Sequence, residues 1–583
     1  MSVSQSIFVS EKALLSQVSK ERLMEFTKEI SKEVRLSGTE EELRAFQYAK
    51  AKLEEFGLDT ELQFNDAYIS LPGQAFLQVG GEDFECITHS MAKSVENIQA
   101  ELVYVEKGTA PDYKNSNVSG KLVLVEGLAT PGGVIQAAKH GAAGAVFINA
   151  KYTHEMIVSP VWGNPTPDTV ELLPDIPVLS VNTSSGEHIK NKLLDNQDEC
   201  KISAEVVTGV RRIPTLTAEI KGQEEPEKFV LFSGHIDSWH YGAMDNGTAD
   251  AVILEVARVL AQHKNSLKRS LRLAFWSGHS HGRYAGSALY CDTNWEDLRE
   301  NCVLHINIDS VGAKDSTVLT EANCMAETKH LAEDAIGSLA GAKFEGARFG
   351  RAGDQSFWGT GTPSLFMGLS EQEPSDEPAA AAFGQLFGAG KSGGFGWWWH
   401  TTEDTMDKID PDNLERDCRI YLSIVYRTVS EPLLSVQQTE AVKDIEESLK
   451  FWQDKSQGHF DLSSALDRVK ELKIKVQSFE QKLKTINLQE SGKLKLANET
   501  IMELSRLLVP LNYVKGSNFG HDLAMKQSPV PKLDAIEKLV SSPKESIEYF
   551  STQTQLLRNY NEVNYTLKKA IQLVDGANQG IVQ

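Results

Sequence analysis

The spacing of apolar residues changes along the chain and divides it into stretches of different predicted structure. Over residues 12–57 apolar residues recur three and four positions apart, which predicts amphipathic helices. The second of these helices is expected to begin after Thr39, a suitable N-cap, and to end near Gly57. From about residue 60 to 208, short apolar runs such as KLVLVEG and AVFINA alternate with Gly, Pro and Asn, which predicts a small β-rich domain.

Residues 214–435 alternate strand-like with helix-like segments. The runs FVLFSGHID, SLRLAFWS, CVLHINIDSV and TPSLFMG predict strands, and the amphipathic stretches between and after them predict helices. This alternation predicts an α/β fold whose mostly parallel, mixed sheet is flanked by helices on both faces. In such a fold, ligands bind at the carboxyl ends of the strands.

The last part of the chain is rich in helix-forming and charged residues. The segment SALDRVKELKIKVQSFEQKLKTINLQ keeps an apolar stripe beside alternating charges. Two interpretations stay open, a bundle that packs on the body of the protein or a subunit interface. A chain of 583 residues is too long for one core, so several domains are expected. The predicted parts are residues 1–60, 61–208, 209–435 and 436–583.

Composition narrows the class of protein. Acidic residues outnumber basic ones by 81 to 59, which gives a formal charge of −22 and argues against a nucleic-acid-binding role. The six cysteines form no CxxC pair, so ordinary buried thiols are expected. The sequence shows no convincing signal peptide and no apolar run of about 18 residues, which predicts a cytoplasmic protein that does not cross a membrane.

Candidate metal ligands follow the predicted strands of residues 214–435. His235 and Asp237 leave the first strand and Asp245 precedes the next helix, while Asp309 and His400 end two later segments. A single histidine at a strand end is more often a structural hydrogen-bonding residue. Two histidines and two aspartates that converge from four strand ends instead favour a metal site, because imidazole nitrogen and carboxylate oxygen are the usual ligands of catalytic zinc.

The sequence blocks around these residues resemble those of a known family. GHIDSWHYGAMDNGTADAVILEVAR, AFWSGHSHGRYAGS, NIDSVG, RAGDQSFWGTGTPSLF and HTTEDTMDKID follow the order of the signature blocks of the M28 zinc peptidases. The order of the parts resembles the glutamate carboxypeptidase/transferrin-receptor-like arrangement, with residues 61–208 as a PA (protease-associated) insert and residues 436–583 as a helical domain. The resemblance implies a zinc-peptidase type of fold, one or two zinc ions per chain, and a homodimer formed through the helical domain.

The resemblance also implies roles for individual residues. Asp245 would bridge two ions, His235 and Asp309 would complete one metal site, and His400 would belong to the other. Asp237 would orient His235 through a hydrogen bond.

The chain departs from the family pattern after the predicted strand SLRLAFW. The family has two adjacent glutamates there, a general base and a metal ligand, and these align with His279 and Ser280. One extra residue follows, so His281 is a second candidate ligand. His279 suits the role of base because the ordinary pKa of histidine lies near 6.5. Three interpretations stay open: a hydrolase with His279 as base, a one-metal hydrolase, and a non-catalytic relative that binds partners as the transferrin receptor does.

The retained cluster of acids favours a metal-dependent peptidase or amidohydrolase. Loss of both glutamates weakens the case for a conventional aminopeptidase, because such acids help to hold a free amine. We therefore expect a small peptide or an N-acyl amino acid as substrate, with an apolar or aromatic group beside the scissile amide. The Gly-rich segment 388–396 is a candidate lid. The residues expected to bind substrate are Trp397, Trp398, Trp399, Asp354, Phe357 and Tyr241.

Overall fold

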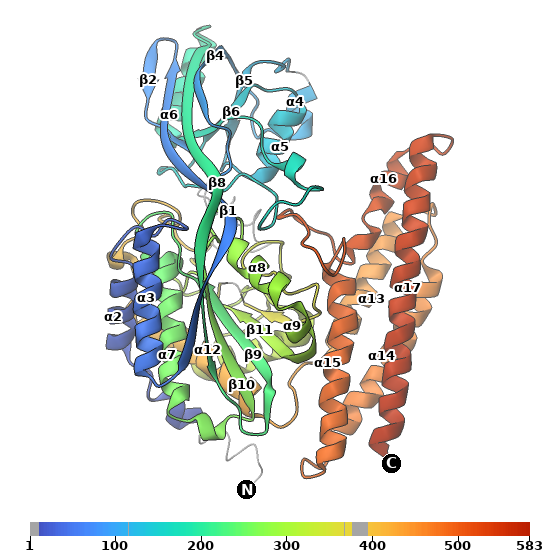
Figure 1. Ribbon diagram of the computed structural model, residues 1–583. Coiled ribbons are helices and arrows are strands. Elements are labelled where there is room, and N and C mark those ends of the chain that lie inside the picture. Colours follow the sequence, from blue (N-terminus) through green and yellow to red (C-terminus); the bar gives the residue numbers. More distant parts are fainter. Residues whose placement is uncertain (1–10, 115, 367, 376–393, 583) are drawn as a thin grey trace.

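Two long strands connect two parts of the molecule in the computed structural model, which describes residues 11–114, 116–366, 368–375 and 394–582. Strand β1 (Asp59–Val79) pairs antiparallel with β8 (Glu199–Ile220) from Asp59 opposite Glu219 to Val79 opposite Cys200. One end of this ribbon lies in a β-rich part and the other in an α/β part (Figure 1). The ribbon therefore fixes how the two parts face each other.

The α/β part contains the predicted mixed sheet, in the order β12-β11-β9-β10-β8. The strands β9 to β12 are parallel to one another, and β10 pairs antiparallel with β8. The helices α7 and α12 contact β9 and β10. Together with α2 and α3 they form a layer beside the sheet (Figure 1). The bounds are β9 Glu225–His235, β10 Arg269–Trp276, β11 Cys302–Asn307, β12 Ser364–Leu365, α2 Lys20–Ile30, α3 Glu40–Glu55, α7 Ala249–Ala261 and α12 Pro411–Ser430.

Both faces of the central strands are buried, which explains why these strands read as continuous apolar runs. In β9, Val230 and Phe232 pack in the core that contains α7 and α12. Their neighbours Phe229 and Leu231 point to the other face and pack with Cys291 of α8 (Ala285–Thr293) and with α9 (Trp295–Asn301). The sheet is thus covered by helices on both faces, and the predicted α/β class is confirmed.

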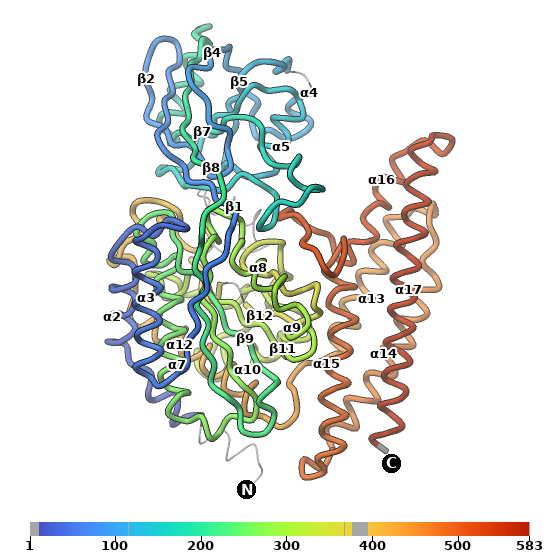
Figure 2. The backbone as a smooth tube through the Cα atoms, viewed as in Figure 1, coloured from blue at the N-terminus to red at the C-terminus, as the bar shows by residue number. Residues whose placement is uncertain are grey.

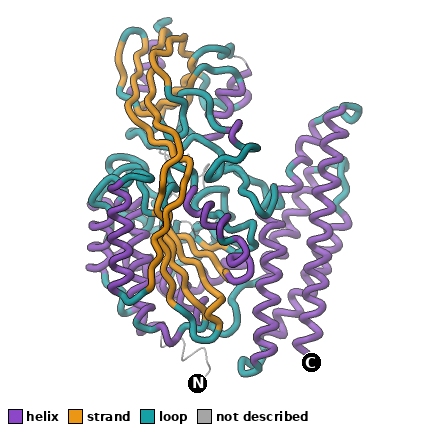
Figure 3. The backbone as a smooth tube through the Cα atoms, viewed as in Figure 1, coloured by secondary structure: helices purple, strands orange, loops and turns teal. Residues whose placement is uncertain are grey.

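The β-rich part has a core of its own. Its strands β4, β5, β6 and β7 pair in parallel, and β3 pairs antiparallel with β7. Two helices, α5 and α6, accompany these strands, and Figure 3 shows long loops between them and the α/β part. The bounds are β3 Ile87–Thr88, β4 Val95–Tyr104, β5 Leu122–Glu126, β6 Gly144–Ile148, β7 Val178–Val181, α5 Pro131–Lys139 and α6 Thr183–Leu194.

The C-terminal part consists of long helices that pack side by side along the α/β part (Figure 2). Arg506 of α15 is buried and donates hydrogen bonds to the carbonyl oxygens of Gly361 at 2.8 Å and Cys302 at 2.6 Å, which attaches this part to the sheet. No helix among the described residues combines the length and apolar content of a membrane span. The bounds are α13 Gln438–Lys455, α14 Ser463–Leu483, α15 Ser491–Tyr513, α16 Ala535–Ser541 and α17 Ile547–Val582.

Two helical glycines should respond in opposite directions to substitution by alanine. A Cβ at Gly186 of α6 would lie 2.4 Å from the Ile148 side chain, whereas at Gly337 of α10 (Lys329–Ala340) the nearest atom lies 4.0 Å away. We expect Gly186→Ala to lower the free energy of unfolding by about 2 kcal/mol through overpacking. We expect Gly337→Ala to raise it by about 0.5 kcal/mol through helix propensity. Chemical denaturation measures both, and shifts of the same sign would contradict this packing.

Candidate active site

The carboxyl ends of neighbouring parallel strands bring the predicted ligands together. His235 is the last residue of β9 and lies opposite Trp276, the last residue of β10. Asp309 follows the end of β11 by two residues, and Asp245 lies in the turn that precedes α7. His400 departs from the expectation, because residues 397–400 form turns rather than a strand. The segments after β9, β10 and β11 therefore follow strand ends, as expected. The fourth segment, which carries His400, is a loop that approaches the same cluster.

His235 is buried between carboxylates. Its Nε2 atom lies 3.3 Å from Oδ1 of Asp245 and 3.7 Å from Oδ2 of Asp309. That nitrogen has no hydrogen-bond partner among the described residues. Asp245 also approaches Nε2 of His400, at 3.1 Å. His235, Asp309 and His279 bring one potential ligand atom each to within 4.8 Å of one another.

The carboxylates of the cluster favour positive charge at the ring of His235. Burial lowers the pKa of His235, but the surrounding carboxylates of Asp237, Asp245 and Asp309 outweigh it and raise this pKa well above its ordinary value. Burial raises the pKa of Asp245, while His235 and His400 outweigh burial and lower it below its usual range. Imidazole and carboxylate donors around one point are the ligand set that zinc takes in catalytic sites, so the residues fit such an ion.

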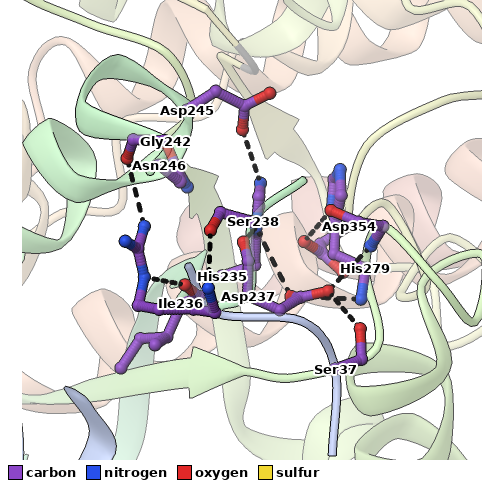
Figure 4. A network of polar contacts seen from close by, with 12 residues as sticks. Ser37, His235, Ile236, Asp237, Ser238, Gly242, Asp245, Asn246, His279 and Asp354 are labelled. Carbon is purple, nitrogen blue, oxygen red and sulfur yellow. Dashed lines mark hydrogen bonds and ion pairs between the residues drawn. The ribbon is translucent and has the colours of Figure 1, made fainter. Parts of the chain in front are cut away.

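Asp237 joins the end of β9 to the loop after β10. Nδ1 of His235 lies 2.9 Å from the carbonyl oxygen of Asp237 and donates to it, which leaves Nε2 as the ring nitrogen that faces Asp245 and Asp309. The carboxylate of Asp237 accepts hydrogen bonds from Oγ of Ser37 at 2.6 Å and from the backbone N–H groups of Ser280 and His279 at 2.9 and 3.3 Å. Figure 4 shows this network around Asp237. The residue orients His235 mainly through its backbone.

Arg35 supports the loop that follows β9 and was not found from the sequence. Its guanidinium group is buried and donates to the carbonyl oxygens of Ile236 at 2.8 Å, Tyr241 at 2.6 Å and Gly242 at 3.1 Å. Burial lowers the pKa of Arg35, and acids that include Asp250 act against this effect. The segment between the two N-terminal helices carries no pattern that signals such a role.

The two histidines of the loop 277–284 have different surroundings. Nδ1 of His279 lies 2.8 Å from Oδ2 of Asp354, and the His279 ring stacks on that of His235 with 3.6 Å between centroids. Since Asp354 holds Nδ1, the lone pair of the His279 ring lies on Nε2. His281 instead contacts Oγ of Ser37 through Nδ1 at 2.9 Å and packs against Trp239, and burial lowers its pKa to about 4.

A cavity of about 230 Å³ opens onto the cluster. The α/β part, the β-rich part and a loop of the C-terminal part all line this cavity. Asp245, Asp309, His279 and His400 form its floor. Aromatic and aliphatic side chains contribute much of the wall, among them Trp239, Tyr284, Phe395, Trp399, Met156 and Met525.

The six residues expected to bind substrate lie in different surroundings, and not all of them line the cavity. Trp399 lines the cavity and stacks on His400, with 3.5 Å between the ring centroids. Trp398 is buried against Met244, and Trp397 stacks on Tyr152 at 4.7 Å.

The other three expected residues lie beyond the cavity wall. Asp354 lies behind His279, and Phe357 packs under the sheet beside Trp276. Tyr241 is exposed. Of the expected lid 388–396, residues 388–393 lie outside the described residues.

Comparison with known proteins gives two family matches. The family described as "Peptidase family M28" matches residues 215–425. The family described as "PA domain" matches residues 98–189. The first match includes every strand end of the metal cluster, and the second lies in the β-rich part.

Individual relatives match over part of their length. A glutamate carboxypeptidase 2 homolog of Caenorhabditis elegans is 23% identical over 288 residues, 36% of this chain and 37% of the relative. Carboxypeptidase Q of Xenopus laevis is 27% identical over 283 residues, 44% and 58% of the two chains. The probable glutamate carboxypeptidase VP8 of Zea mays is 38% identical over 93 residues, 15% and 13%. The chain thus spans less than two thirds of the length of each of these relatives.

Solved structures share the fold. An aminopeptidase from Aneurinibacillus sp. strain AM-1 matches with a TM-score of 0.54 and 22% identity, covering 73% of this chain and 97% of its own. The zinc aminopeptidase BSAP from Bacillus subtilis matches with a TM-score of 0.55 and 19% identity, covering 71% and 96%. At these identities the likeness concerns the fold alone, and it agrees with the predicted zinc-peptidase type of architecture.

Arg35 and Arg44 provide a matched test of the support beneath the site. Arg35→Met leaves buried carbonyl groups without donors, so we expect it to lower the free energy of unfolding by about 3 kcal/mol. Arg44 is partly exposed and pairs with Glu33 and Glu41 at the surface, so Arg44→Met should cost less than about 1 kcal/mol. Chemical denaturation measures both variants. Equal decreases in the free energy of unfolding for the two variants would show that Arg35 does not support the loop.

Proposed function

Since residues 215–425 match the family described as "Peptidase family M28", we propose that this protein is a metal-dependent hydrolase of peptide or amide bonds. The observation that carries the proposal is the buried Nε2 atom of His235, which lies between the carboxylates of Asp245 and Asp309 without a hydrogen-bond partner in the described part of the chain. A zinc-type cation is the partner that such an atom fits. The division of the chain at residues 60, 208 and 435 stays a prediction.

His235, Asp245 and Asp309 are the residues that would hold the ion. When bound, a zinc-type ion supplies a Lewis acid that polarises the scissile carbonyl and stabilises the charge that develops on its oxygen. Asp237 and Arg35 hold the loop that presents His235, so the cluster keeps its geometry before substrate arrives.

His279 is the proton acceptor in this proposal. Asp354 engages Nδ1 of its ring and itself accepts a hydrogen bond from Oγ of Ser287 at 2.7 Å, which fixes the tautomer with the lone pair on Nε2. The ring stacks on that of His235, and His279 lines the cavity. A neutral imidazole there can take a proton from water as it attacks and return it to the leaving amine.

The lining of the cavity supports an N-blocked substrate with an apolar group. Among the described residues, the acids that line it are Asp245 and Asp309, which belong to the metal cluster, so this part of the lining has no further carboxylate to hold a free amine. The basic residues Arg283, Arg351 and Lys526 also line the cavity and would favour a substrate carboxylate. A small peptide or an N-acyl amino acid with an aromatic or aliphatic side chain fits this distribution. Trp399 is the expected aromatic contact.

The quaternary structure and the location belong to the same proposal. A homodimer would use residues 436–583, where Ile474 of α14 and Leu557 and Tyr565 of α17 expose apolar surface. The cytoplasmic location stays a prediction.

The zinc-loaded protein should hydrolyse N-acetyl-phenylalanine and N-acetyl-leucine at least about tenfold faster, by kcat/KM, than phenylalanine amide and leucine amide. The reason is that the described part of the cavity lining has no spare acid for the free amine. A ninhydrin or chromatographic assay of the released amino acid measures this ratio, with chelator-treated protein as the control. Preference for the amides would favour an aminopeptidase. Absence of hydrolysis in both sets by metal-loaded protein would favour the binding-protein alternative.

His279→Gln should lower kcat/KM by about 10²- to 10⁴-fold while the bound zinc stays near the wild-type level, because the variant loses a proton acceptor. Asp354→Asn should also lower kcat/KM, because the neutral amide can accept from Nδ1 or donate to it and so no longer fixes one tautomer of His279. His188→Gln, at an exposed histidine of the β-rich part, is the matched control. Activity is compared with zinc content from plasma mass spectrometry. Loss of zinc from His279→Gln would make His279 a ligand instead of the base.

A further inference from the structure

Trp239 fills the space between the residues that would hold a second ion. It follows His235 in the loop that Arg35 supports, and its side chain is almost completely buried. Its ring packs against His281 with 4.5 Å between centroids and against His400 with 5.3 Å. The indole therefore lies in contact with both histidines that the sequence offers as ligands beyond His235.

The indole N–H occupies the ring nitrogen of His400 that a metal would need. Nδ1 of His400 lies 2.7 Å from the carbonyl oxygen of Glu155, so Nδ1 carries the proton and the lone pair lies on Nε2. Nε1 of Trp239 donates a hydrogen bond to that same Nε2 atom at 3.1 Å. The lone pair on Nε2 of His400 can accept the indole proton or bind a cation beside Asp245, but it cannot do both at once.

The remaining donors do not complete a second site. Ser280 stands where the family has a carboxylate ligand, and its backbone N–H donates to Asp237. His281 contacts Ser37 through Nδ1, and its Nε2 has no hydrogen-bond partner among the described residues. There it forms no group of three potential ligands with Asp245 and His400. Among the residues that the structure describes, only Asp245 is left beside His400, whereas a catalytic zinc ion takes about three protein ligands.

We infer that this protein binds a single ion, at His235, Asp245 and Asp309, and that Trp239 takes the place of a second ion by holding His400. The inference rests on the proposed function, which supplies the first ion, and disagrees with the two ions that the family resemblance allows. It makes Asp245 a ligand of one ion instead of a bridge between two. It makes Trp239 and His400 positioning residues at the wall of the cavity.

The number of ions per chain tests the inference directly. Metal-free protein is titrated with Zn²⁺, and bound ions are counted by native mass spectrometry and by calorimetry. We expect one equivalent for the wild type, and none for His235→Gln at a zinc concentration that saturates the wild type. Two equivalents that bind the wild type within about tenfold of each other in affinity would overturn the inference.

A gain of the second site gives an independent readout. The double variant Trp239→Phe/Ser280→Glu frees Nε2 of His400 and restores a carboxylate, so we expect two equivalents of Zn²⁺. Adding His400→Gln to the double variant should return the count to one. Circular dichroism and thermal unfolding confirm that each variant is folded before its ions are counted. A folded double variant that still binds one ion would show that Trp239 and Ser280 do not close the site.

The outcomes separate this inference from the proposed function. A wild type that binds one ion and hydrolyses neither substrate set keeps the inference about the second site and contradicts the hydrolase. A wild type that binds two ions and hydrolyses N-acyl amino acids keeps the hydrolase and overturns the single ion.

Discussion

The imidazole of His235 sets the constraint on which the site depends. Its Nδ1–H is fixed by a backbone carbonyl, and its Nε2 lies buried between two carboxylates with which it forms no hydrogen bond. Like charges packed in a dry place are costly, so such an arrangement persists only when something supplies the missing positive charge. In the proposed function a bound cation would do so for Asp245 and Asp309, while Arg35 adds a fixed positive charge behind the loop.

The support for this cluster comes from parts of the chain that lie far apart in sequence. Ser37 and Arg35 precede the second N-terminal helix, yet they hold Asp237 and the backbone after β9. Asp237 in turn accepts the N–H groups of His279 and Ser280, and so fixes the loop after β10. Asp237 therefore joins the end of β9 to the loop after β10.

The sheet and the strand-end ligands could be predicted from the sequence, because their signal is local. Phe229 to Phe232 form a continuous apolar run since both faces of β9 are buried, and polar ligands follow where the strand leaves the core. The roles of Arg35 and Trp239 could not be predicted. Each depends on contacts with residues distant in sequence, and nothing near either residue marks it. The three tryptophans before His400 diverge because they lie in turns, where neighbouring side chains point in different directions.

Three parts of the chain line the cavity, and buried arginines connect these parts. Arg283, from the loop after β10, donates to the carbonyl oxygen of Ser159 in the β-rich part at 2.9 Å. Arg351 is stacked over Trp162 of the β-rich part at 3.8 Å and lies over Trp358 at 4.9 Å. It also donates to the carbonyl oxygen of Asp522 in the C-terminal part. These contacts hold together a cavity whose walls come from three parts of the chain. In the proposed function, its walls would select the substrate while the strand ends would carry the chemistry.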